Sequence, residues 1–68
     1  MTVKFTDVGR HKKSWTEDIP ELNYSSLKKA VHGKKAIGSR HPDFEIDGTR
    51  GKIFAGWNLV GLFEILTP

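Results

Sequence analysis

A glycine-punctuated, sheet-forming run occupies the last third of this chain, from Asp43 to Leu66, and limits the folds open to it. The run is dense in large apolar side chains, so much of the core must be built there. An Asp-Gly pair at Asp47 and Gly48 favours the positive φ angles of a hairpin turn. The run therefore predicts antiparallel strands over residues 43–46, 52–57 and 59–66, with bulges or tight bends at its internal glycines.

The first part of the chain predicts two strands and a helix. Residues 3–8 alternate and are rich in β-branched side chains, which is typical of a half-buried strand. Residues 14–19 can return as a second strand, with Trp15 facing inward. Asn23 is a good helix N-cap, and apolar residues at helical spacing follow it. We therefore expect a helix from Tyr24 to about Ala36, in which Gly33 is either the C′ residue or an internal weak point.

These segments predict an α+β fold in the order β-β-α-β-β, with an antiparallel sheet of four or five strands and one helix packed on one face. A chain of 68 residues forms a single domain, residues 1–68. It has no cysteine, so disulfides and Cys-ligated zinc are excluded and stability must come from packing or self-association. The predicted core comprises Val3, Phe5, Trp15, Ile19, Leu22, Leu27, Val31, Phe44, Ile46, Ile53, Ala55, Leu59, Phe63 and Ile65.

Two segments share part of a ligand-binding motif. Gly33 and Gly38 have the spacing of a P-loop, but Ser39 and Arg40 stand where that motif needs Lys and then Ser or Thr. The acids from Asp43 onward alternate like those of a calcium loop, but the twelfth position is Phe54 instead of glutamate. The three histidines form no i, i+4 pair and lie among cationic residues, which disfavours metal binding. We therefore predict no cofactor and no metal.

A third segment partly matches an RNA-recognition consensus. Residues 50–57 share its opening Arg-Gly, its fifth-position Phe and its final aromatic. Lys52 stands where the consensus has an aromatic, and the chain lacks a second helix. We therefore interpret these aromatic residues as core.

An enzymatic function is not expected. The serines lie in no nucleophile motif, and the acids of residues 17–21 resemble a solvated edge before the helix. A chain this short also has little volume for a substrate pocket of ~300 Å³. The start of the chain lacks the apolar run of a signal peptide, and no apolar stretch approaches the ~18 residues of a membrane span. We expect a cytoplasmic protein with no membrane contact.

Charge is distributed unevenly along the chain. Residues 1–42 hold nine Lys and Arg against four Asp and Glu, whereas residues 43–68 hold two against four. A basic surface of this kind attracts an acidic partner. The sequence thus predicts a small accessory protein that binds nucleic acid through its phosphate backbone. The predicted contact residues are Arg10, Lys12, Lys13, Lys28, Lys29, Lys35 and Arg40.

An alternative prediction is a protein-binding module or inhibitor of the kind that viruses and mobile elements encode. The sheet must be covered on both faces, or else one face or edge remains as a contact surface for a protein partner or a second copy. The sequence leaves open which face the apolar residues of the last strands take. The residues that would form this surface are Phe54, Trp57, Val60 and Leu62.

Overall fold

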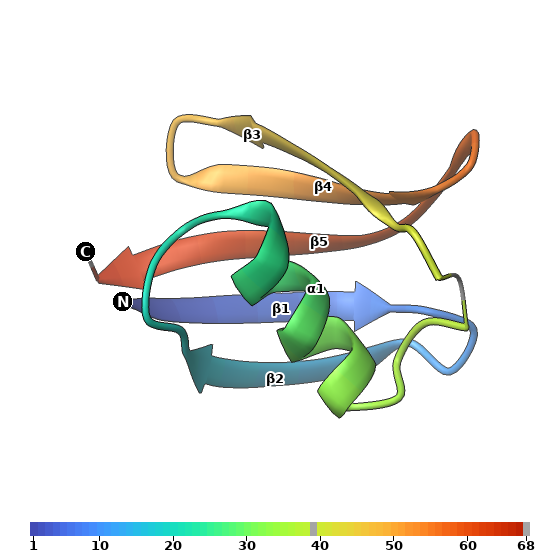
Figure 1. Cartoon of the computed structure of the whole chain (residues 1–68), viewed down its shortest axis with the longest axis horizontal. Coiled ribbons are helices and arrows are strands. Elements are labelled where there is room, and N and C mark those ends of the chain that lie inside the picture. Colours follow the sequence, from blue (N-terminus) through green and yellow to red (C-terminus); the bar gives the residue numbers. More distant parts are fainter. Residues whose placement is uncertain (39, 68) are drawn as a thin grey trace.

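Residues 1–38 and 40–67, which the computed structural model describes, form a five-stranded antiparallel sheet and one helix (Figure 1). The predicted α+β class is confirmed, and the sheet has five strands, the larger of the two numbers predicted, in the order β-β-α-β-β-β. In chain order the elements are β1 (Thr2–Val8), β2 (Lys13–Asp18), α1 (Tyr24–Gly33), β3 (Asp43–Asp47), β4 (Arg50–Ala55) and β5 (Asn58–Thr67).

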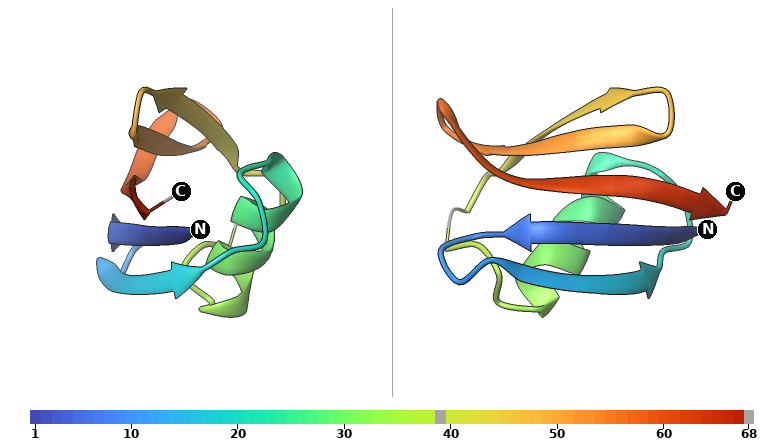
Figure 2. Two further views of the ribbon diagram at one scale, coloured as in Figure 1. Left: turned by 90° about the vertical axis from the view of Figure 1, so that its left-hand side faces the viewer. Right: turned by 180° about the vertical axis from the view of Figure 1, so that it is seen from behind.

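The first and last strands pair with each other inside the sheet. The strand order is β2-β1-β5-β4-β3, and every neighbouring pair is antiparallel. The β1–β2 hairpin and the β3–β4–β5 meander are thereby joined into one sheet. The two chain termini lie side by side at one end of this sheet (Figure 1). Helix α1 lies against one face, here called the inner face, and no described segment covers the opposite, outer face (Figure 2).

Helix α1 begins at Tyr24 as predicted, because Asn23 caps it. The Asn23 side-chain oxygen accepts a hydrogen bond from the backbone N–H of Ser26 at 2.8 Å. Leu27, Ala30 and Val31 form the buried stripe that faces the sheet. No helix of the described residues is long and apolar enough to cross a bilayer.

The helix ends at Gly33, and the prediction that it continues to about Ala36 is wrong. The N–H of Ala36 donates to the Val31 carbonyl at 3.1 Å, and the N–H of Lys35 donates to the His32 carbonyl at 3.0 Å. This is the hydrogen-bond pattern of a Schellman motif, which needs one residue in the left-handed region. Lys35 takes that conformation with φ of 54°. The chain turns there and buries Ala36 against the core.

The core lies between α1 and the inner face of the sheet. On the sheet side, the Phe5 ring stacks on Trp15, which confirms that Trp15 faces inward, with centroids 4.6 Å apart. The Phe63 ring is tilted relative to Phe5 and lies edge-to-face with Phe44, and the centroids are 6.2 Å apart in both pairs. The buried residues are Val3, Phe5, Val8, Ile19, Leu27, Ala30, Val31, Ala36, Ile53 and Phe63. The half-buried residues packed against them include Trp15, Leu22, Phe44 and Ile65.

Three predicted core residues lie elsewhere. Leu59 is 54% exposed, and Ile46, on the edge strand β3, is 44% exposed because no further strand flanks it. Ala55 is half-buried, close to the β4–β5 turn. For these residues the period-2 pattern of the sequence predicted the wrong degree of burial.

Two bulges explain why strict alternation fails. In β5 the register shifts so that Ile53 pairs with Gly61 but Phe54 pairs with Leu59, which leaves Val60 as the extra residue. The extra residue moves Leu59 from the inner to the outer face. In β1 the register likewise shifts between Phe5 and Val8. This second shift turns Val8 inward, and Val8 is buried in the core. The sequence pattern did not predict Val8 as a core residue.

Candidate nucleic-acid interface

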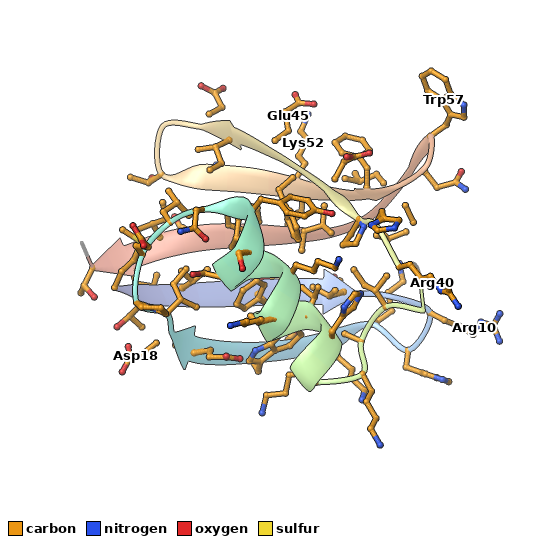
Figure 3. All side chains as sticks on the ribbon, viewed as in Figure 1. Arg10, Asp18, Arg40, Glu45, Lys52 and Trp57 are labelled. Carbon is orange, nitrogen blue, oxygen red and sulfur yellow. The ribbon has the colours of Figure 1, made fainter. Side chains whose placement is uncertain are left out.

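Three segments that are distant in sequence meet at one end of the sheet. They are the β1–β2 loop, the C-terminal end of α1 and the segment that leads into β3 (Figure 1). Arg10 and Arg40 project from this end, whereas Asp18 lies at the opposite end (Figure 3). The lysine and arginine side chains of the three segments are exposed, as are His11 and His41, whereas His32 in the last turn of α1 is half-buried. We call the exposed residues the basic end: Arg10, His11, Lys12, Lys13, Lys34, Lys35, Arg40 and His41.

Backbone contacts hold the segments of the basic end together. A Cβ built on Gly9 would overlap the carbonyl oxygen of Ala36, so glycine is required for this close approach. The Lys13 ammonium donates to the Lys34 carbonyl at 2.8 Å and so ties β2 to the end of the helix. The N–H of Gly9 donates to the Val60 carbonyl at 2.7 Å, which joins the loop to the bulge of β5.

A shallow, open hollow of about 450 Å³ lies where these contacts converge. Its lining combines glycines and apolar side chains with the cationic residues Arg10 and Lys35. A hollow of this form suits a flat or extended ligand better than an enclosed small molecule. The lining residues are Gly9, Arg10, His11, Lys35, Ala36, Ile37, Gly38, Ala55 and Val60.

The cations of the basic end form no ion pair with a carboxylate among the described residues. The ion pair that the described residues do form lies on the outer face, where Arg50 Nε is 3.8 Å from Glu64 Oε2. The chain has no acidic residue between Glu21 and Asp43, a stretch that covers the helix and the segment after it. Asp7 near the end of β1 and Asp43 at the start of β3 also lie at this end, but the cations outnumber them. An excess of positive charge produces a local positive potential, which attracts anions and is screened by salt.

Five of the seven predicted contact residues belong to the basic end, and two do not. Lys28 lies on the flank of the helix with its ammonium 5.9 Å from the centre of the Tyr24 ring. Lys29 is exposed on the side of the helix opposite the buried stripe. The structure therefore separates these two lysines from Arg10, Lys12, Lys13, Lys35 and Arg40.

The sequence-based site omitted Lys34. That residue is the helix C-cap, and its carbonyl accepts the hydrogen bond from Lys13. A helix that continued to Ala36 would have placed Lys34 on a regular helical turn. Gly33, the last helical residue, was one possible end signal in the sequence, but the left-handed position is occupied by Lys35 instead of that glycine.

The residues of the alternative, protein-binding prediction do not form one surface. Trp57 is fully exposed on the β4–β5 turn, so its interpretation as a core residue is wrong. Val60 is half-buried at the bulge. On the outer face, Phe54 pairs with the exposed Leu59. Leu62 is 45% exposed on the outer face, between Thr6 and Lys52 of the neighbouring strands.

The outer face also carries a row of alternating charge. Lys4 of β1 is opposite Glu64 of β5, which is opposite Arg50 of β4. Arg50 is in turn opposite Asp47 of β3. Opposite charges on directly paired positions stabilise a sheet modestly. The row makes this face close to neutral, in contrast to the basic end.

Metal ligands and known relatives give no further indication of function. The described residues hold no group of three or more His, Asp or Glu side chains that could bind a metal ion, and none of their buried side chains is polar or charged. Comparison with known proteins finds no family model, no curated protein and no solved structure that matches. Function must therefore be inferred from the basic end and the uncovered outer face.

Proposed function

We propose that the protein binds nucleic acid by contacting backbone phosphates with its basic end. The observation that supports this most strongly is the convergence of cations from three segments at one end of the sheet, without carboxylate partners among the described residues. Phosphate binding releases condensed counterions from the nucleic acid, which supplies affinity without new apolar contacts. Phosphate contacts carry no sequence information, so we expect little preference among sequences.

The charge distribution also favours a defined orientation on the ligand. Asp18 and Asp47 lie at the end of the sheet away from the basic end, so a polyanion is repelled there and attracted at the other end. The outer face is near neutral along its charged row and is a weaker site for phosphates.

The proposal is tested by fluorescence anisotropy with a labelled oligonucleotide at several salt concentrations. If about four phosphates are neutralised, the logarithm of the binding constant should fall with the logarithm of salt with a slope of roughly −3 to −4. No binding even at about 50 mM salt contradicts the proposal.

Two matched double variants locate the contact. Arg10→Ala with Arg40→Ala removes two charges from the basic end, and Lys4→Ala with Lys52→Ala removes two from the outer face. All four side chains are exposed, so both variants should fold. The first should reduce the salt slope by about two, since each lost phosphate contact reduces it by about one, and the second should leave it nearly unchanged. Equal effects contradict the assignment to the basic end.

A second candidate function is self-association through the outer face. If two copies pack outer face to outer face about a two-fold axis, the row of Lys4, Glu64, Arg50 and Asp47 runs in opposite directions in the two copies. Each charge then faces a residue of opposite charge in the second copy. Exposed Leu59 and Leu62 would add apolar contact. Light scattering over a range of concentrations tests this. An average molar mass that rises from the monomer value towards the dimer value with concentration supports self-association, and a constant monomer mass rejects it.

A further inference from the structure

Trp57 is the most exposed large apolar residue of the described chain. It is 100% exposed, whereas the other tryptophan, Trp15, is half-buried against Phe5. A tryptophan side chain left in water forgoes the stabilisation that burying a large apolar side chain gives. The fold gains nothing from Trp57 through packing, so its presence calls for an explanation outside the core.

The turn that carries Trp57 does not require tryptophan. Ala55 pairs with Asn58, so Gly56 and Trp57 are the two loop residues of a tight hairpin. Gly56 has φ of 65°, and Trp57 is not among the residues with positive φ. A two-residue turn with glycine first accepts almost any residue in second place. Substitution of Trp57 should therefore leave the fold intact.

Trp57 lies at the same end of the sheet as the basic end. The β4–β5 turn, the β1–β2 loop and the start of β3 occupy this end because the strands are antiparallel. Figure 3 shows Trp57, Arg10 and Arg40 all projecting from this end, with Asp18 at the other. Ala55 and Val60, which flank the turn, also line the hollow beside Arg10. An aromatic ring and several cations thus lie at the same end of the sheet.

We propose, resting on the function proposed above, that the ligand is single-stranded nucleic acid and that Trp57 stacks on an unpaired base while the basic end holds the phosphates. Sites for single strands combine a positive surface that follows the backbone with an aromatic ring that stacks on bases. In a duplex the faces of the bases are already stacked, and an exposed ring finds no partner except at an end. Charge complementarity favours this ligand over an apolar protein partner, because the cations at the same end of the sheet as Trp57 form no ion pair with a carboxylate among the described residues.

The test compares Trp57→Ala with the unmodified protein on a labelled single strand and on a duplex with the same number of phosphates, its ends closed by non-nucleotide linkers so that it presents no unpaired base. The variant should bind the single strand about 5- to 150-fold more weakly, which is the range for one stacked base, and should bind the duplex within about twofold of the unmodified protein. Trp57→Phe should restore most of the lost affinity, whereas Trp57→Leu should not, because only an aromatic ring stacks.

A Trp15→Phe background gives an independent readout. It keeps an aromatic ring against Phe5 and leaves Trp57 as the only tryptophan. The single strand should then quench the fluorescence of Trp57, and the duplex should not.

Three outcomes overturn the inference. The first is an equal loss on single strand and duplex. The second is recovery by Trp57→Leu, which indicates an apolar contact instead of stacking. The third is normal single-strand binding by Trp57→Ala, which leaves the phosphate-binding proposal standing and points to another partner for this residue. If the unmodified protein binds neither ligand, the phosphate-binding proposal itself fails.

Discussion

Gly9 shows how one residue determines whether the basic end can assemble. It has φ of 79°, and any Cβ there would overlap the Ala36 carbonyl. The site therefore depends on a residue that carries no charge itself. In the sequence, Gly9 marks only the start of a polar loop, because the contact joins segments more than twenty residues apart.

Gly9→Ala should destabilise the protein far more than Gly48→Ala. Gly48 has a similar φ of 67°, but nothing lies within 4 Å of the position that a Cβ would take there, so alanine meets only the conformational penalty of about 1 kcal/mol. Gly9→Ala adds a clash with backbone and should lower the free energy of unfolding by at least ~2 kcal/mol more. Urea denaturation measures both values. Equal losses would show that the contact with Ala36 is not required.

At the scale of elements, the sequence predicted what local signals determine. The capping of α1 by Asn23 and the alternation in β1 need only neighbouring residues, and both are present as expected. The bulges at Val60 and before Val8 shift the register inside the β4–β5 and β1–β2 hairpins. Strict alternation carries no signal for such a shift, so it misplaced Leu59 and left Val8 out of the core.

The end of α1 was likewise not predictable from local preference, and it leads to a second stability test. Lys35→Gly should raise the free energy of unfolding by about 1 kcal/mol, since glycine adopts the left-handed conformation without a Cβ penalty. Lys34→Gly removes the same charge but at a right-handed position, φ −85°, and should lower it by roughly 0.5–1 kcal/mol. Thermal or urea denaturation distinguishes the signs. A rise in both variants would mean that charge repulsion, and not backbone conformation, controls this helix end, and a fall in both would show that the left-handed conformation of Lys35 is not the cause.

At the scale of the whole molecule, the sequence revealed a surplus of cations in residues 1–42 but not their arrangement. Five of the predicted contact residues come together because the β1–β2 loop, the helix end and the approach to β3 share one end of an antiparallel sheet. Lys28 and Lys29 are equally basic in sequence, yet the helix directs them elsewhere. Topology, which no local pattern encodes, decides which charges act together.

In the function proposed here, one end of the molecule makes the contact with nucleic acid. An amide chemical-shift titration of the isotope-labelled protein with a single-stranded oligonucleotide examines every part of the surface at once. We predict that the largest shifts fall on residues 9–13, 34–38 and 40–41 and on the 56–57 turn, while Lys4, Glu64 and Asp18 stay unchanged. Shifts concentrated on the outer face of the sheet, or none at all, would contradict this assignment.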